Sequence, residues 1–136
     1  MVSKIKILLF TALMLMTLAS CDDTPIGSPI CTAEYVTINL KVTDAAGQPV
    51  ENADINITHS VSGETLQVCE SFECADGKMG NYTLFHDGLM EEVSFEGEAF
   101  IVTVTAEEGS FREEFIFAKD ECHVFKKSGP ESVSVN

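Results

Sequence analysis

Residues 36–55 carry the sequence VTINLKVTDAAGQPVENADI, and this stretch decides the fold class. Apolar and polar residues alternate over residues 36–43, so one row of side chains can face a core while the other faces water. Residues 44–47 have the composition of a turn, and Pro49 restricts the connection that follows. Alternation resumes over residues 53–58. The stretch therefore predicts two strands joined by a tight connection.

The same period of two continues downstream, where we find neither a helical stripe nor an internal repeat. Further strands are predicted over residues 65–69, 81–86, 98–107, 111–118 and either 122–125 or 132–135. Residues 108–110 form the predicted hairpin turn, and residues 89–97 are a connection whose apolar side chains could contact the core. About seven short strands with regular turns predict an all-β sandwich.

The quoted stretch also resembles the opening of carboxypeptidase regulatory-like domains: an apolar strand, Asp, Gly, one residue, Pro-Val, a small residue and a second apolar strand. Residues 80–84, GNYTL, resemble the later Gly-x-Tyr-x-Leu strand of those domains, and residues 100–109 resemble the strand before their last hairpin. The resemblance implies a seven-stranded, transthyretin-like (prealbumin-like, Ig-like) sandwich over residues 35–136. In carboxypeptidases this domain is an accessory to a separate zinc-binding catalytic domain, so the resemblance implies no peptidase activity.

The first 20 residues predict a helical signal peptide. Lys4 and Lys6 precede an apolar run over residues 7–18, which has the length of a signal-peptide core and is short for a membrane-spanning helix. Residues 18–21, LASC, follow directly and resemble the lipobox of bacterial lipoproteins. We therefore predict cleavage before Cys21 and attachment of lipid, including fatty acyl chains such as palmitate, to its thiol.

Residues 21–34 are predicted to form the lipidated cysteine and a short tether, because Pro, Gly and Ser are frequent there. Asp22 and Asp23 resemble the surface-export signal of Bacteroidota lipoproteins, which favours the outer membrane or the cell surface. In enterobacteria an aspartate at this place would instead favour retention in the inner membrane. In either case the domain is expected outside the cytoplasm.

The chain carries a formal net charge of −14, and removal of the leader's two lysines would lower it to about −16. This balance argues against nucleic acid as a partner, because binding to phosphates needs clustered Lys and Arg. It also argues against electrostatic docking on an anionic bilayer. A solubilising surface is the simplest explanation, and a site for a cation or a cationic partner is the alternative.

Four cysteines remain when Cys21 is set aside. In an oxidising compartment they should form two disulfides, and four cysteines allow three pairings. We favour Cys69–Cys74, which would close a local loop, and this leaves Cys31–Cys122 to join the start of the domain to its last strand. A zinc site made from these thiols and His123 is the rival hypothesis.

No motif of hydrolytic enzymes surrounds His59, His86 or His123, so we expect no catalytic residues, no metal and no cofactor. Acidic residues in loops that could converge and hold calcium are Asp76, Asp87, Glu91 and Glu92. A solvated acidic rim is the simpler explanation for these carboxylates.

The sequence therefore predicts a non-enzymatic, lipid-anchored accessory or binding module of the cell envelope, whose partner is an unidentified protein or glycan. The alternative is an envelope metal-dependent binder or hydrolase that uses His86 or His123 with the loop acids. A third possibility is a subunit of a larger assembly, because exposed edge strands can pair with another chain.

Overall fold

The computed structural model describes residue 27, residues 29–70 and residues 74–136. The chain divides into two units, Met1–Ile30 and Cys31–Asn136. The predicted signal peptide and Cys21 lie outside the described residues. The elements of the second unit are β1 (Thr37–Thr43), β2 (Asp54–His59), η2 (Lys78–Gly80), β3 (Asn81–His86), η3 (Asp87–Glu92), β4 (Glu98–Ala106), β5 (Gly109–Lys119), β6 (Val124–Ser128) and β7 (Ser132–Ser134).

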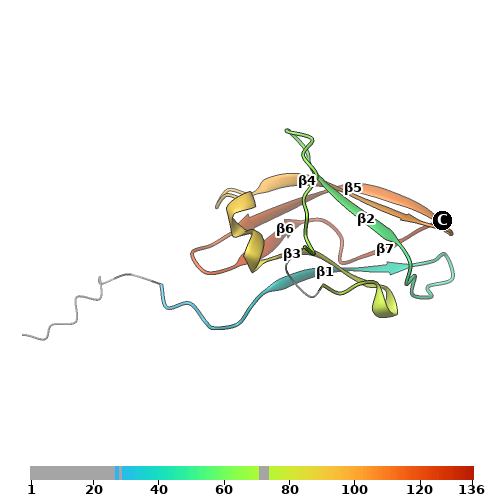
Figure 1. Cartoon of the computed structure of the whole chain (residues 1–136), viewed down its shortest axis with the longest axis horizontal. Coiled ribbons are helices and arrows are strands. Elements are labelled where there is room, and N and C mark those ends of the chain that lie inside the picture. The colour runs from blue at the N-terminus through green and yellow to red at the C-terminus, as the bar shows by residue number, and fades with distance from the viewer. Residues whose placement is uncertain (1–26, 28, 71–73) are drawn as a thin grey trace, which may run out of the picture. The chain divides into compact units, whose positions relative to one another are not determined.

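The seven strands of the described residues form two sheets, with the strand orders β3-β1-β7 and β2-β4-β5-β6 (Figure 1). All neighbouring strands are antiparallel except β1 and β7, which run parallel. The predicted all-β, seven-stranded sandwich is confirmed. The helical elements among the described residues are short turns of 3-10 helix, in agreement with the missing helical stripe.

Strand β1 shows why the alternating sequence specifies a half-buried strand. Leu40 and Val42 are fully buried, whereas Thr37, Asn39 and Lys41 are exposed. The turn that follows is held by its first side chain, because Asp44 Oδ1 accepts hydrogen bonds from the backbone N–H groups of residues 46 and 48. Gly47 in this turn has a φ of 78°, which favours glycine.

The core lies between the sheets and contains a cluster of phenylalanine rings. Phe85 of β3 stacks on Phe117 of β5 with ring centroids 4.8 Å apart, and Phe100 of β4 contacts both rings. All three side chains are almost completely buried, and each contributes on the order of 2 kcal/mol of hydrophobic free energy. The ring pairs join the two sheets, since β3 belongs to one and β4 and β5 to the other.

Two details of the predicted strands are wrong. Residues 65–69 form no strand; a single bridge, Thr58 to Thr65, joins them to β2 before the chain leaves that edge. The two alternatives for the last strand, in contrast, both exist, as β6 and β7. The hairpin turn lies one or two residues earlier than predicted, because Ala106 already pairs with Gly109. In the connection over residues 89–97, Val93 is buried but Phe95 is exposed.

The strand registers define two ends of the sandwich. Thr37 pairs with His86, His59 with Phe100, Glu98 with Phe117, and Lys119 with Val124. One end of the sandwich, here called the Cys31 end, therefore contains the start of β1, the ends of β2, β3 and β5, and the starts of β4 and β6. The turn between β4 and β5 and the C-terminal residue lie at the far end (Figure 1). Among the described residues, no helix is both long and apolar enough to cross a membrane.

Candidate functional site

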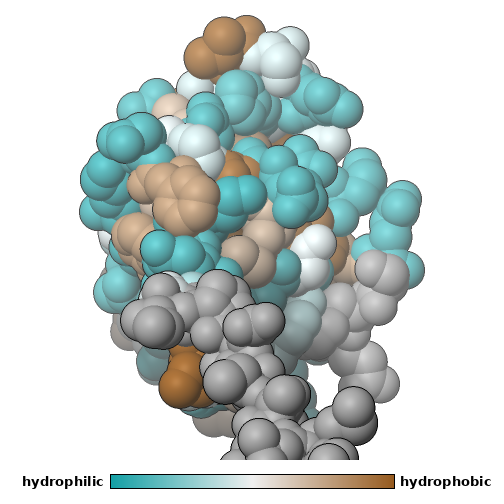
Figure 2. All heavy atoms as spheres, turned by 90° about the vertical axis from the view of Figure 1, so that its left-hand side faces the viewer, coloured by the Kyte–Doolittle hydropathy of each residue, from teal (hydrophilic) through white to brown (hydrophobic). Residues whose placement is uncertain are grey.

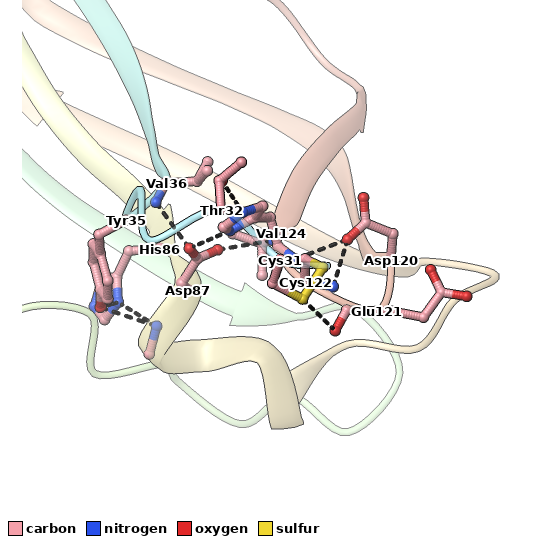
Figure 3. Close-up of polar contacts among 12 residues, drawn as sticks. Cys31, Thr32, Tyr35, Val36, His86, Asp87, Asp120, Glu121, Cys122 and Val124 are labelled. Atoms are coloured by element: carbon pink, nitrogen blue, oxygen red, sulfur yellow. Dashed lines mark hydrogen bonds and ion pairs between the residues drawn. A yellow bond between two sulfur atoms is a disulfide. The ribbon is translucent and has the colours of Figure 1, made fainter. Parts of the chain in front are cut away.

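The most connected polar group of the Cys31 end is the carboxylate of Asp87, the first residue after β3 (Figure 3). Its Oδ2 accepts a hydrogen bond from the backbone N–H of Val36 at 2.8 Å, and its Oδ1 accepts one from the N–H of Val124 at 2.9 Å. The Nδ1 atom of His123 donates to Oδ2 at 2.8 Å. One side chain thus joins the chain entering β1, the end of β3 and the start of β6.

Asp87 has a pKa below its usual value of 3.8. Partial burial acts in the opposite direction and raises the pKa, because it disfavours the charged form. The two backbone hydrogen bonds, together with the hydrogen bond and positive charge of His123, stabilise the carboxylate more strongly and lower the pKa overall. The Asp87 side chain is therefore an ionised carboxylate at neutral pH.

A disulfide lies beside this carboxylate. Cys31 is bonded to Cys122, which is the residue before His123, and the two cysteines are 91 positions apart in the sequence. Asp120 shapes the loop that presents them, since its Oδ1 accepts hydrogen bonds from the backbone N–H groups of Cys122 and His123. These two hydrogen bonds lower the pKa of Asp120. The first residue of the second unit is therefore fixed covalently to the start of β6.

Thr32, His123 and Asp87 form a row of hydroxyl, imidazole and carboxylate, and Figure 3 labels the threonine and the aspartate at its two ends. The Thr32 Oγ1 atom lies 3.1 Å from His123 Nε2, and His123 Nδ1 lies 2.8 Å from Asp87 Oδ2. Because Nδ1 donates to the carboxylate, a neutral His123 accepts from the threonine hydroxyl through Nε2. This order of groups is the one found in hydrolases with an activated hydroxyl nucleophile.

His86 belongs to a second polar group at the same end. Its Nε2–H donates to the carbonyl of Val68 at 2.8 Å, and its Nδ1 accepts from the Tyr35 hydroxyl at 2.7 Å. The backbone N–H of Gly88 points at both Nδ1 and that hydroxyl. The histidine is almost completely buried, and its ring holds the chain before β1 and the irregular segment after residue 65 against β3. Both ring nitrogens are thus engaged in structural hydrogen bonds.

The third histidine, His59, closes the turn after β2. Its Nδ1 accepts from the backbone N–H groups of Val61 and Ser62, and its ring meets Phe100 edge-on. Its Nε2 lies 3.7 Å from an Oε2 atom of Glu98. His59 is therefore separate from the other two histidines, and the described contacts give it a role in the turn.

The loop acids proposed as calcium ligands do not converge. Asp76 bridges to Tyr82 near the start of β3, whereas Asp87 follows the end of that strand, so the two lie at opposite ends. Glu91 and Glu92 are exposed on η3. Within the part of the chain that the structure describes, no group of three or more His, Cys, Asp and Glu residues could hold a metal ion. The hypothesis of a shared calcium site is wrong for these residues.

The second predicted disulfide, Cys69–Cys74, is also present. Both predicted pairings are therefore confirmed, and the rival zinc site is wrong because all four sulfurs are engaged in disulfides. Cys21, the predicted lipidation site, lies outside the described residues.

A cavity of about 490 Å³ opens between the edge of β2 and the segment that covers β3. Its apolar lining includes Ile55, Ile57, Val68 and Tyr82, and the Cys69–Cys74 disulfide lies at its border. A second cavity of about 420 Å³ lies beside His59. Thr32, His123 and Asp87 line neither cavity.

Sequence reasoning missed the contributions of Thr32, Tyr35 and Asp120. The first two lie in or next to the stretch predicted as tether and domain boundary. The predicted pairing of Cys31 with Cys122 was a usable signal, because it places the neighbours Thr32 and His123 side by side.

Comparisons of the whole chain give no identification: it matches no protein-family model, no curated protein and no solved structure.

Proposed function

We propose that this protein is a non-enzymatic, lipid-anchored accessory or binding module of the bacterial cell envelope. The leader and the LASC sequence at residues 18–21 support the anchor. The resemblance to carboxypeptidase regulatory-like domains supports an accessory role, and the partner is a protein or a glycan. We propose that the domain lies outside the cytoplasm, at the outer membrane or the cell surface.

One observation carries the non-enzymatic part of the proposal: the polar side chains of the Cys31 end are used to hold chain segments together. Asp87 binds two backbone N–H groups as well as His123, and His86 binds the Val68 carbonyl and Tyr35. Together with the Cys31–Cys122 disulfide, these contacts make a rigid joint between the incoming chain and the sandwich. A rigid joint suits a module that is presented from a membrane.

The anchor predicts a clear result for Cys21→Ala. The variant should leave the membrane fraction and should no longer incorporate labelled palmitate, because the thiol that accepts the lipid is missing. Ser20→Ala is the matched control, since it keeps both the cysteine and a small residue before the cleavage point. Unchanged membrane fractionation of Cys21→Ala would refute the lipoprotein proposal.

A hydrolase is the second candidate, and the row Thr32–His123–Asp87 is the observation that favours it. Two features make it the weaker candidate. The row lines neither of the two cavities described above, and Asp87 also holds two backbone segments, which by itself accounts for its position.

Incubation with a fluorophosphonate probe should therefore leave Thr32 unmodified, as judged by mass spectrometry of the intact protein. Thr32→Val, which keeps the shape and removes the hydroxyl, should hydrolyse p-nitrophenyl acetate at the same low rate as the wild type. A probe adduct on Thr32 that disappears in His123→Gln would establish the hydrolase and overturn the non-enzymatic proposal.

A further inference from the structure

We propose that the Cys31 end of the sandwich docks directly on an electrically neutral lipid surface, with exposed aromatic side chains at the level of the headgroups. The inference rests on the proposed lipid anchor and adds an orientation and a contact surface to it.

The exposed large apolar side chains of the second unit are unevenly distributed. Tyr35, Val61, Phe95 and Phe125 are 48%, 88%, 60% and 42% exposed. Tyr35 lies just before β1, Val61 in the turn after β2, Phe95 just before β4, and Phe125 near the start of β6. All four positions belong to the Cys31 end, whereas Met79, the remaining one among the described residues of this unit, precedes β3 at the far end.

The preceding chain brings this same end to the membrane. Nine residues lie between Cys21 and Cys31, so the two cysteines are ten positions apart and the chain between them spans at most about 35 Å when fully extended. Since Cys31 is bonded to Cys122, the attachment point cannot move away from the sandwich by fraying of the first strand. A lipid on Cys21 therefore keeps the Cys31 end, and its aromatic side chains, within a short distance of the bilayer.

The pattern of the surface fits lipid better than a second protein. Figure 2 views the Cys31 end and shows apolar side chains separated by hydrophilic ones. A protein interface of useful affinity needs a continuous, well-packed apolar centre. Isolated aromatic side chains, in contrast, can each insert at the boundary between headgroups and acyl chains, as in the aromatic belts of membrane proteins.

Charge decides which lipid surface is compatible. Exposed carboxylates at the Cys31 end include those of Glu91, Glu92, Glu96, Asp120 and Glu121. Anionic headgroups would repel these carboxylates, and the repulsion acts over a Debye length of about 8–10 Å at physiological salt. The surface therefore fits zwitterionic lipids such as phosphatidylethanolamine, and docking should weaken as anionic lipid is added.

The test uses the full-length lipidated protein in vesicles of phosphatidylethanolamine and phosphatidylcholine that carry brominated acyl chains. The chain contains no tryptophan, so Phe95→Trp and Phe125→Trp each supply a single reporter at the Cys31 end. Met79→Trp supplies the matched control at the far end, where the side chain is 66% exposed. We expect brominated lipid to reduce the emission of the first two variants about twofold, with no change for the control.

Addition of anionic phosphatidylglycerol should reverse part of that quenching, and raised salt should restore it by screening. If brominated lipid leaves the emission of all three variants unchanged while the protein is still bound to the vesicles, the docking is overturned and the anchor is left intact. Protein that stays in the aqueous fraction would overturn the anchor as well. Absent quenching in the vesicles, combined with a crosslink to another protein in intact cells that is lost in Phe95→Ser/Phe125→Ser, would overturn lipid docking and assign the surface to a protein partner.

Discussion

Replacing Cys31 and Cys122 together by serine is expected to lower the free energy of unfolding by roughly 4–5 kcal/mol. The two cysteines are 91 positions apart, so their disulfide removes a large loop-closure entropy from the unfolded chain. Urea unfolding of the oxidised wild type and the double variant, followed by far-ultraviolet circular dichroism, measures the difference. For a domain of this size such a loss is a large part of the total stability.

Cys69→Ser/Cys74→Ser is the matched control for this experiment. Its cysteines are only 5 positions apart, so the same entropy argument gives a loss of roughly 2 kcal/mol. The two double variants remove the same chemical groups and differ in the length of the loop. Equal losses, or a larger loss for the short loop, would contradict an entropic role for the Cys31–Cys122 bond.

Asp87→Asn is expected to cost about 3 kcal/mol, because asparagine cannot reproduce the hydrogen bonds of the carboxylate. Both oxygens of Asp87 accept bonds from backbone N–H groups, and asparagine would turn an NH2 group toward either Val36 or Val124. The charge that faces His123 is lost as well. Chemical unfolding at neutral pH measures the effect.

Asp120→Asn provides the control for that substitution. Asp120 uses a single oxygen, Oδ1, to accept both of its backbone hydrogen bonds, so an asparagine oxygen can take over the same role. We expect little change in stability at this exposed position. A loss as large as that of Asp87→Asn would show that net charge, and not hydrogen-bond geometry, is the cause.

The penalty of Asp87→Asn should also depend on pH. The folded-state pKa of Asp87 lies below its usual value of 3.8, so between the two values the unfolded chain binds more protons than the folded one. The carboxylate therefore stabilises the fold fully above about pH 4, and this contribution is lost as the pH falls through the folded-state pKa. The difference between wild type and Asp87→Asn should shrink in acid; a constant difference would contradict this assignment.

The strands that could be predicted are those in which burial follows the alternation of the sequence. In β4, Phe100, Val102 and Val104 are all buried, as their period of two indicates. Residues 65–69 also place Leu66 and Val68 against the core, but they do so as irregular chain. The Val68 carbonyl binds His86 on the opposite sheet, and this tertiary contact draws the segment away from β2.

The candidate site was predictable in its covalent part and not in its hydrogen bonds. The cysteine count led to the Cys31–Cys122 pairing, whereas the sequence placed Asp87 among possible calcium ligands. Its role depends on backbone N–H groups of Val36 and Val124, and backbone donors carry no signature in the residue types. Contacts of this kind become visible only when the strand ends are placed in space.

The Cys31–Cys122 bond also determines where mechanical load enters the domain. Tension on the chain before Cys31 passes through this bond to Cys122 and so reaches the start of β6 directly. Strand β1 is therefore not pulled away from its neighbours β3 and β7. Residues 32–121 lie inside the covalent loop, so they are shielded from a pull between the amino terminus and the segment after Cys122. A pull between the anchor and a partner bound to the segment after Cys122 would thus pass through the disulfide and leave residues 32–121 out of the covalent load path.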